Sequence, residues 1–437
     1  MMKKIIALPV LLFVFCIRLS AQNGDSLPVF TLRECITSAF ENSPRSELIA
    51  AERLQARTNV LNTLSPLLPL VSLSSGWNRS GQGGTLVEVP GQAPVVTEDV
   101  TADNFQTNLS VAQTLLDASA FTQISQVPNI HRMAETMSEE SRAELAFSVK
   151  QQFYSLVQLH SAYRVSQAAV EQVEQQVEVA REQFRLGSIA RPELLRVKVA
   201  LIQQRVEVIN AQAALVNGRR ALANLIGVDY PVQIDTSLQF PDTSGALPSQ
   251  DSLLKIVLEK NPSYQLSQLS LDVQKSNELA TRLRILPSVS GTFAYGYSAP
   301  EFGADWSDND FWSLGVDLSF SIFERLSRYA QVREAAAQTR ISQSNTEITR
   351  TNVVQQVNES YANLQTAQQT LLLVPDLLEQ AREEFRLTRE QFRLGAASAL
   401  DFLQSQLVYN EAQQQAVQII TNYYVAQAQI QQLLGEW

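Results

Sequence analysis

The sequence repeats itself at a fixed distance, and this duplication limits the fold more than any other feature. The segment Glu182–Gly187, which reads Glu-Gln-Phe-Arg-Leu-Gly, returns unchanged at Glu390–Gly395, 208 residues later. A second landmark keeps the same distance, because Leu225-Ile226-Gly227 corresponds to Leu433-Leu434-Gly435. Similarity at a fixed period indicates that one structural unit occurs more than once. The chain is therefore predicted to contain two equivalent repeats.

Each repeat is predicted to have the order helix, strand, strand, long helix, helix. The first repeat covers residues 22–250, with a linker rich in proline and glycine at 228–250, and the second covers residues 251–437. The first helices are predicted at about Thr31–Ser65 and Gln250–Ile285, the long helices at about Ala118–Leu186 and Glu324–Leu394, and the final helices at about Pro192–Ile226 and Ala399–Leu434. A helix of this length spans on the order of 100 Å at ~1.5 Å per residue.

The long helices carry apolar residues in alternating steps of three and four. This stripe runs from Leu156 to Phe184 and, in the second repeat, from Leu364 to Phe392. A sustained period of 3.5 residues predicts coiled-coil packing. Gly187 and Gly395 then end these helices, which places hairpin tips at residues 184–192 and 392–400. Pro375 is expected to kink its helix without ending the stripe.

Four segments alternate apolar and small polar residues, which is the opposite pattern. They lie at about 70–79, 104–116, 288–298 and 311–323. Such alternation is typical of membrane-barrel strands, with lipid on one face and water on the other. The aromatic side chains that fit an interfacial girdle are Trp77, Tyr295, Tyr297 and Trp312. The alternative is an amphipathic sheet that packs on a helical layer.

Four strands are too few to close a barrel by themselves, since the smallest membrane barrels have about eight. An open sheet edge in lipid leaves backbone groups without hydrogen bonds, at several kcal/mol each. Closure therefore requires two or more copies of the chain around an axis.

The N-terminus has the pattern of a secretory signal peptide at residues 1–21. Basic Lys3 and Lys4 precede the apolar run Ile5–Ile17, and cleavage is expected after Ala21. The mature chain then keeps one cysteine, Cys35, which lies on an apolar helical stripe and is predicted to be a core residue.

Charge and motifs argue against nucleic-acid binding and enzymatic chemistry. The formal net charge is −10, which disfavours a nucleic-acid partner. His131 and His160, the two histidines, stand 29 residues apart, so they do not form a pair of metal ligands at helical spacing. The chain has no Gly-Lys-Ser/Thr phosphate loop. We predict no enzyme activity, no metal and no cofactor.

Taken together, the signal peptide, the duplicated element order and the Phe-Arg-Leu-Gly tips followed by Asp401-Phe402-Leu403 resemble the TolC family of outer-membrane efflux proteins. The resemblance implies a mainly α protein with a membrane β part. It implies a homotrimer whose twelve-stranded barrel, in contact with outer-membrane lipid, continues into a long periplasmic α-helical coiled-coil barrel. It also implies a passive exit duct served by a periplasmic adaptor (a membrane fusion protein) and an inner-membrane pump.

The resemblance also suggests site residues. The positions that match the adaptor-contact tips are Arg185, Leu186, Gly187, Arg393, Leu394 and Gly395. The positions that match an acidic ring at the periplasmic entrance are Asp401 and Gln404, so one of the two acids is missing. Repulsion among three copies of Asp401 would raise their pKa values. The alternative is that Asp401 only caps its helix with Ser398, and Glu193, its equivalent, is expected to serve a helix start.

Two other functions remain open from the sequence. One is a structural, trimeric coiled-coil protein of the envelope without a transport role, although such a spacer would not need the strand pairs. The other is a periplasmic adaptor, which would show one helical hairpin rather than two.

Overall fold

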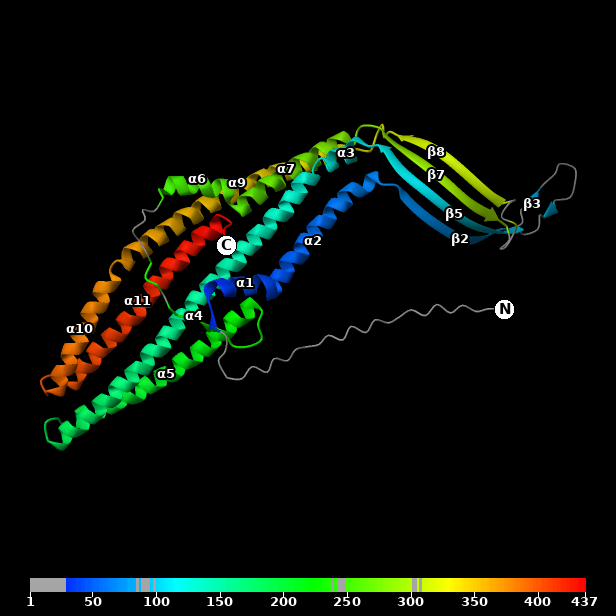
Figure 1. Ribbon diagram of the computed structural model, residues 1–437. Helices are drawn as coiled ribbons and strands as arrows, with labels where there is room; N and C mark the ends of the chain where they lie inside the picture. Colours follow the sequence, from blue (N-terminus) through cyan, green and yellow to red (C-terminus); the bar gives the residue numbers. More distant parts are fainter. Residues whose placement is uncertain are drawn as a thin grey trace, which may run out of the picture.

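The structure is a computed structural model that describes residues 29–83, 86–87, 95–96, 100–237, 239–241, 248–300, 305 and 309–437. The protein is long and curved, with helical hairpin tips at one end and a β-sheet at the other (Figure 1). The predicted signal peptide at residues 1–21 and part of the 228–250 linker lie outside the described residues.

The two repeats have the same order of elements, which confirms the duplication. The first contains α1 (Leu32–Asn42), α2 (Pro44–Leu64), the 3-10 turn η1 (Ser65–Leu67), β2 (Leu70–Gln82), β5 (Val100–Leu116), α3 (Ala118–Ile124), α4 (Val127–Arg185) and α5 (Arg191–Ile226). The second contains α6 (Gln250–Lys260), α7 (Pro262–Leu283), β7 (Ser288–Ala299), β8 (Asp310–Ser319), α9 (Ser327–Leu371), α10 (Val374–Arg393) and α11 (Ala399–Leu433). Short strands are β1 (Val29–Phe30), β3 (Leu86–Val87), β4 (Val95–Val96) and β6 (Gln233–Ile234).

The predicted continuous first helices are wrong, because each is divided in two at a proline. Ser43 and Asn261 have extended backbones and cap the second helix of each pair, and Pro44 and Pro262 follow as the first helical residue. Proline has no N–H to donate and disfavours helical geometry in the residue before it. The chain therefore ends one helix and restarts another at the same place in both repeats.

The long helices are also interrupted, which corrects the prediction of a simple kink at Pro375. Helix α9 ends at Leu371 and α10 begins at Val374, with Pro375 in its first turn; Pro128 stands likewise at the start of α4. The apolar stripe nevertheless continues across the break between α9 and α10, as expected. Its buried members are Leu364, Ala367, Leu371, Val374, Ala381, Phe385 and Phe392.

The glycines that end the last helix of each repeat lie against the first helices of the same repeat. Gly227, with φ of 76°, ends α5 directly against the backbone carbonyl of Asn42. In the second repeat Gly435, with φ of 72°, lies against Pro262, and a Cβ there would stand 3.0 Å from the proline Cγ. The end of the last helix in each repeat therefore packs against the proline break between the first two helices of that repeat.

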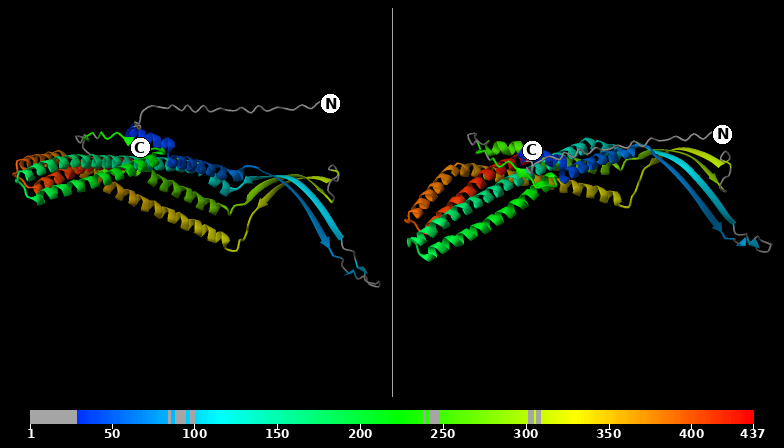
Figure 2. Two further views of the ribbon diagram at one scale, coloured as in Figure 1. Left: turned by 90° about the horizontal axis from the view of Figure 1, so that it is seen from below. Right: turned by 60° about the horizontal axis from the view of Figure 1, so that its bottom comes forward.

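The helices form one layer in which α4 packs between α5 and α11, and α11 packs against α10 and α9. Helices α1 and α6 lie on one side of this layer (Figure 2). The linker joins this side through a parallel pairing of β1 with β6. Cys35 is fully buried, in the core cluster that α1 forms with α4 and α5, as predicted.

The sheet has the order β2-β5-β7-β8 and is antiparallel throughout, so the two repeats contribute adjacent hairpins. Paired residues share a face of the sheet. On one face the aligned rows are Val71–Val111–Phe293–Leu314 and Leu73–Leu109–Tyr295–Trp312, and on the other Ser72–Ser110–Ala294–Ser313. The alternation seen in single segments is thus in register across all four strands.

The predicted strand at 311–323 is wrong at its C-terminal end. β8 stops at Ser319, whose pairing partner Ser288 is the first residue of β7. Pro287 precedes that partner and cannot donate to a ladder, so residues 320–323 have no strand to pair with. Arg325 and Leu326 then take positive φ values of 46° and 68° and turn the chain into α9.

Candidate functional site

The two hairpin tips end their helices in the same way. Gly187 and Gly395 have φ values of 74° and 77°, in the left-handed region that favours glycine. The next backbone N–H reaches back five residues in each case, from Ser188 to the Gln183 carbonyl and from Ala396 to the Gln391 carbonyl, both at 2.8 Å. This is the C-terminal capping pattern expected from the sequence. The tips therefore present equivalent backbones at one end of the molecule (Figure 1).

The predicted contact residues of the tips are exposed. Arg185 and Arg393 each pair with the glutamate three residues earlier, at 2.8 Å to Glu182 and 3.0 Å to Glu390. Such exposed pairs contribute little stability. Leu186 and Leu394 are 69% and 76% exposed, which leaves an uncovered apolar side chain at each tip.

The packing beneath the two tips differs although their sequences match. Phe392 is 2% exposed and stacks on Phe402, with 5.5 Å between ring centroids. Its repeat equivalent Phe184 is 43% exposed. Gln183 donates from Nε2 to the Phe392 carbonyl at 2.9 Å and so ties the first tip to the second. The matching sequences gave no sign of this asymmetry, because it depends on contacts between the hairpins.

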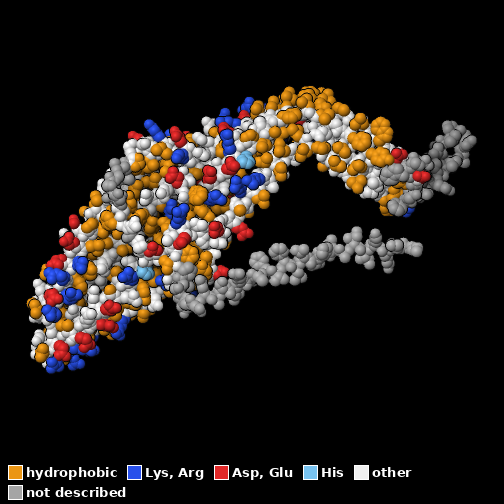
Figure 3. All heavy atoms as spheres, viewed as in Figure 1, with side chains coloured by type: hydrophobic (Ala, Val, Ile, Leu, Met, Phe, Trp, Pro, Cys, Tyr) orange, Lys and Arg blue, Asp and Glu red, His pale blue; other side chains and the backbone are white. Residues whose placement is uncertain are grey.

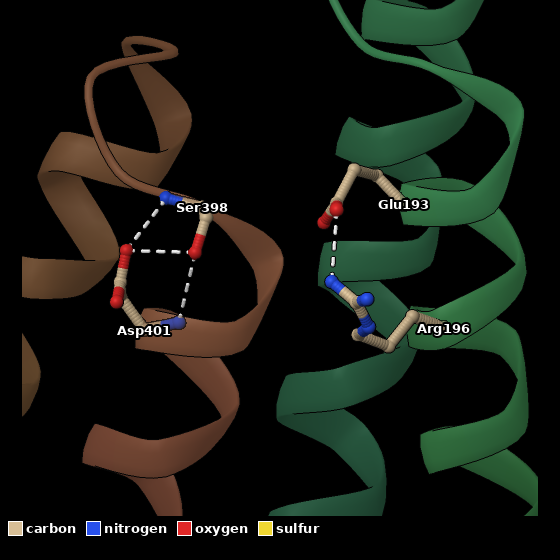
Figure 4. A network of polar contacts seen from close by, with 4 residues as sticks. All are labelled: Glu193, Arg196, Ser398 and Asp401. Carbon is tan, nitrogen blue, oxygen red and sulfur yellow. Dashed lines mark hydrogen bonds and ion pairs between the residues drawn. The ribbon is translucent and has the colours of Figure 1, made fainter.

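Asp401 forms the cap that we considered as its alternative role (Figure 4). Its Oδ2 accepts hydrogen bonds from the Ser398 backbone N–H at 3.0 Å and from the Ser398 hydroxyl at 2.7 Å. Its own N–H donates to the Ser398 Oγ at 3.2 Å. The hydrogen bonds from Ser398 lower the pKa of Asp401. Gln404, one turn further along α11, is exposed. One chain cannot form a ring, so that role stays a prediction.

The first repeat carries a different charge pattern at the equivalent place. Glu193 lies in the first turn of α5 and accepts from Arg196 at 2.8 Å (Figure 4). Arg196 is the repeat equivalent of Gln404, and Ala190, which precedes α5, has no side chain to cap it. The first repeat thus neutralises its acid, whereas Asp401 keeps a net negative charge.

The four predicted girdle residues lie on the apolar face, in three neighbouring rows at the loop end of the sheet. Trp77, Trp312 and Tyr295 are 57%, 71% and 37% exposed, whereas Tyr297 is buried at 8%. They form a single group beside the Arg79–Asp103 ion pair of 2.7 Å.

A second group of aromatic residues, not predicted from the sequence, lies at the opposite, helix end of the sheet. Phe320 and Phe323 are 54% and 79% exposed there. Hydrophobic side chains gather over the strands and over the junction with the helices (Figure 3). The run Phe320-Ser-Ile-Phe323 carries a signal for this second aromatic group, but its alternation of apolar and polar residues also fits a continuation of the strand.

No helix among the described residues has the length and apolar character needed to cross a membrane. Within the same part of the chain, no three His, Cys, Asp or Glu side chains come together in a way that could hold a metal ion.

Comparison with known proteins identifies the family. The family model described as outer membrane efflux protein matches residues 35–228 and 253–436, one match for each repeat. The chain is 20% identical over 409 residues to the outer membrane protein TolC of Vibrio cholerae, covering 92% of this chain and 90% of that protein. It is 22% identical over 392 residues to the probable efflux pump outer membrane protein TtgC of Pseudomonas putida, covering 88% and 78%.

The fold is also shared with solved structures. The outer membrane channel CmeC of Campylobacter jejuni superimposes with a TM-score of 0.78 at 18% identity, covering 92% of this chain and 85% of that one. The chain therefore belongs to the outer membrane efflux protein family, and is a non-enzymatic transport protein of the outer membrane.

Proposed function

We propose that three copies of this chain close one twelve-stranded barrel in the outer membrane and continue as a tube of helices through the periplasm. The observation that carries this proposal is the sheet, whose apolar face is exposed and whose edge strands β2 and β8 each pair on one side only among the described residues. Unpaired edges in lipid cost several kcal/mol per backbone group. Pairing β2 of one copy with β8 of the next removes every edge if the rotation closes.

The helical part supports the same assembly. Leu195, Val199, Ile202, Val206 and Ile209 form a stripe on α5 that is 49–65% exposed. We call these five residues the α5 stripe. Helix α11 packs between α4 and α10, whereas α5 lies at the edge of the layer. A neighbouring copy that covers the stripe also continues the helical layer around the axis.

In this assembly the chain acts as the passive exit duct of a tripartite efflux or secretion system. A periplasmic adaptor docks on the exposed tips around Leu186 and Leu394, and an inner-membrane pump supplies the substrate. The relative TtgC is named as a component of an efflux pump, which agrees with this role.

The entrance of the duct carries Asp401. Three copies bring three carboxylates near the axis, next to the neutralised Glu193–Arg196 pairs. A ring of this kind favours cations. Repulsion among the copies opposes the effect of Ser398, which lowers the pKa of Asp401 in one chain.

The first experiment is the oligomeric mass of the protein extracted from outer membranes in mild detergent. We expect a trimer that gives discrete conductance steps in planar bilayers. A stable monomer overturns the shared barrel. A trimer without conductance in any condition favours the structural envelope protein instead.

The entrance ring has its own test. Asp401→Asn should reduce the cation preference of single channels measured by reversal potential in a salt gradient. The control is Glu193→Gln combined with Arg196→Gln, which removes an ion pair and leaves the net charge unchanged. Unchanged selectivity in Asp401→Asn removes the ring role and leaves the capping role, while the duct itself stands.

A further inference from the structure

We infer that a cavity of about 740 Å³ between α4, α10 and α11 binds a small amphiphilic anion, an apolar chain that ends in one carboxylate or phosphate group. Thr236 and Ser237 of the linker form part of its wall. Arg382, its lining residue on α10, stands 13 residues before Gly395, or ~20 Å along the helix. The cavity is therefore separate from the tips and from the sheet.

The charged side chains that line the cavity are all basic, and the nearest acid on the linker, Asp235, is engaged by the Ser237 hydroxyl at 2.6 Å. His160 and Arg164 lie one turn apart on α4, and Arg382 approaches from α10. No acidic residue is among the described residues that line the cavity. In the described part of the chain, no carboxylate lies within ion-pair distance of these three side chains, although arginines at the tips pair with nearby glutamates. A chain with net charge −10 thus keeps an unneutralised basic group here.

The electrostatic environment of His160 agrees with this arrangement. Burial, together with the positive charges of Arg219 and Arg164, lowers the pKa of the imidazole. An anion in the cavity relieves this repulsion, and guanidinium groups hold carboxylate or phosphate oxygens through paired hydrogen bonds.

The rest of the cavity is apolar. Val157 and Ala416, each 3% exposed, form its deepest described side chains, and Leu378, Tyr409, Val417 and Ile420 extend the wall. The volume falls within the ~300–1,000 Å³ of small-molecule sites. Basic side chains beside apolar walls match a ligand with a charged head and an apolar body, and they disfavour both cations and compact hydrophilic anions.

The test is equilibrium dialysis of radiolabelled octanoate against the full-length protein in nanodiscs of zwitterionic lipid, with empty discs subtracted. We expect saturable binding of one octanoate per chain. Unlabelled octyl phosphate is the second arm, and the better competitor of the two identifies the head group. Octyltrimethylammonium has the same tail with the opposite charge and should not compete.

Variants separate the site from nonspecific uptake. Arg164→Gln combined with Arg382→Gln should weaken octanoate binding at least tenfold. Arg57→Gln, which changes an exposed arginine on α2, should leave it unaltered. Ala168→Trp keeps both arginines but fills the cavity, and should cause the same loss with an unchanged oligomeric mass.

Three results would overturn the inference. They are binding no greater than to empty discs, equal competition by octyltrimethylammonium, and undiminished binding in the double arginine variant.

Discussion

Gly187 and Gly227 have the same left-handed backbone but different surroundings. A Cβ at Gly187 meets open space, whereas one at Gly227 overlaps the backbone of Asn42. Gly187→Ala should lower the free energy of unfolding by about 1 kcal/mol, because alanine is strained in the left-handed region. Gly227→Ala has the same strain and also brings its Cβ into the backbone of Asn42. It should lower the free energy of unfolding by about 3 kcal/mol or more. Denaturation in detergent checks the difference, and equal losses would show that the contact with Asn42 is unimportant.

A single residue, His160, also makes the stability of the protein depend on pH. Its folded-state pKa lies below the ordinary 6.5, so the unfolded chain takes up a proton first as pH falls. The contribution of His160 to stability is therefore full above pH 6.5 and declines as the pH falls below it. Arg164→Gln removes one positive neighbour and should raise the pKa of His160. NMR titration of the imidazole measures the pKa of His160, and His131→Gln assigns the two histidine signals. A lower pKa in Arg164→Gln would contradict the prediction.

At the scale of elements, the two hairpins start their second helices differently. Ser398 caps α11 with Asp401, whereas Ala190 has the same extended backbone before α5 but no capping oxygen. Ala190→Ser should stabilise the protein by about 1 kcal/mol, because Glu193 already stands at the third helical position. Ser398→Ala should destabilise it by a similar amount and raise the pKa of Asp401. Thermal unfolding measures both changes in stability. If Ala190→Ser destabilised the protein, Glu193 would have kept its ion pair with Arg196 and would not have joined the new cap.

The elements also show what the sequence could reveal. The order of helices and strands was predictable, because apolar periods of 3.5 and 2 are local properties. The sequence predicts continuous long helices, whereas new helices start at Pro128 and Pro375. The break at Pro375 could not be predicted from the apolar stripe, because the stripe continues through it. The position of the aromatic group at one end of the sheet depends on pairing between β5 and β7, which lie far apart in the chain. The unequal burial of Phe184 and Phe392 likewise needs contacts that identical segments cannot reveal.

At the scale of the whole molecule, the α5 stripe tests the assembly. Ile209 is 65% exposed in one chain and becomes buried in the proposed trimer. Ile209→Glu should therefore weaken association by about 2 kcal/mol per copy and shift the mass in detergent toward monomer. Gln203→Glu places the same charge on α5 outside the stripe and should leave the trimer intact. Equal behaviour of the two variants would place the subunit contact elsewhere.

The unequal packing of the two tips has a consequence for symmetry. In the proposed trimer, two similar repeats in each of three chains arrange six hairpins around one axis, which approximates sixfold rotation. Phe184 is exposed where Phe392 is buried, so alternate hairpins differ and only threefold rotation survives at the tips. A ring-shaped partner built from identical units would consequently meet two chemically distinct surfaces in alternation, and could engage one of them before the other.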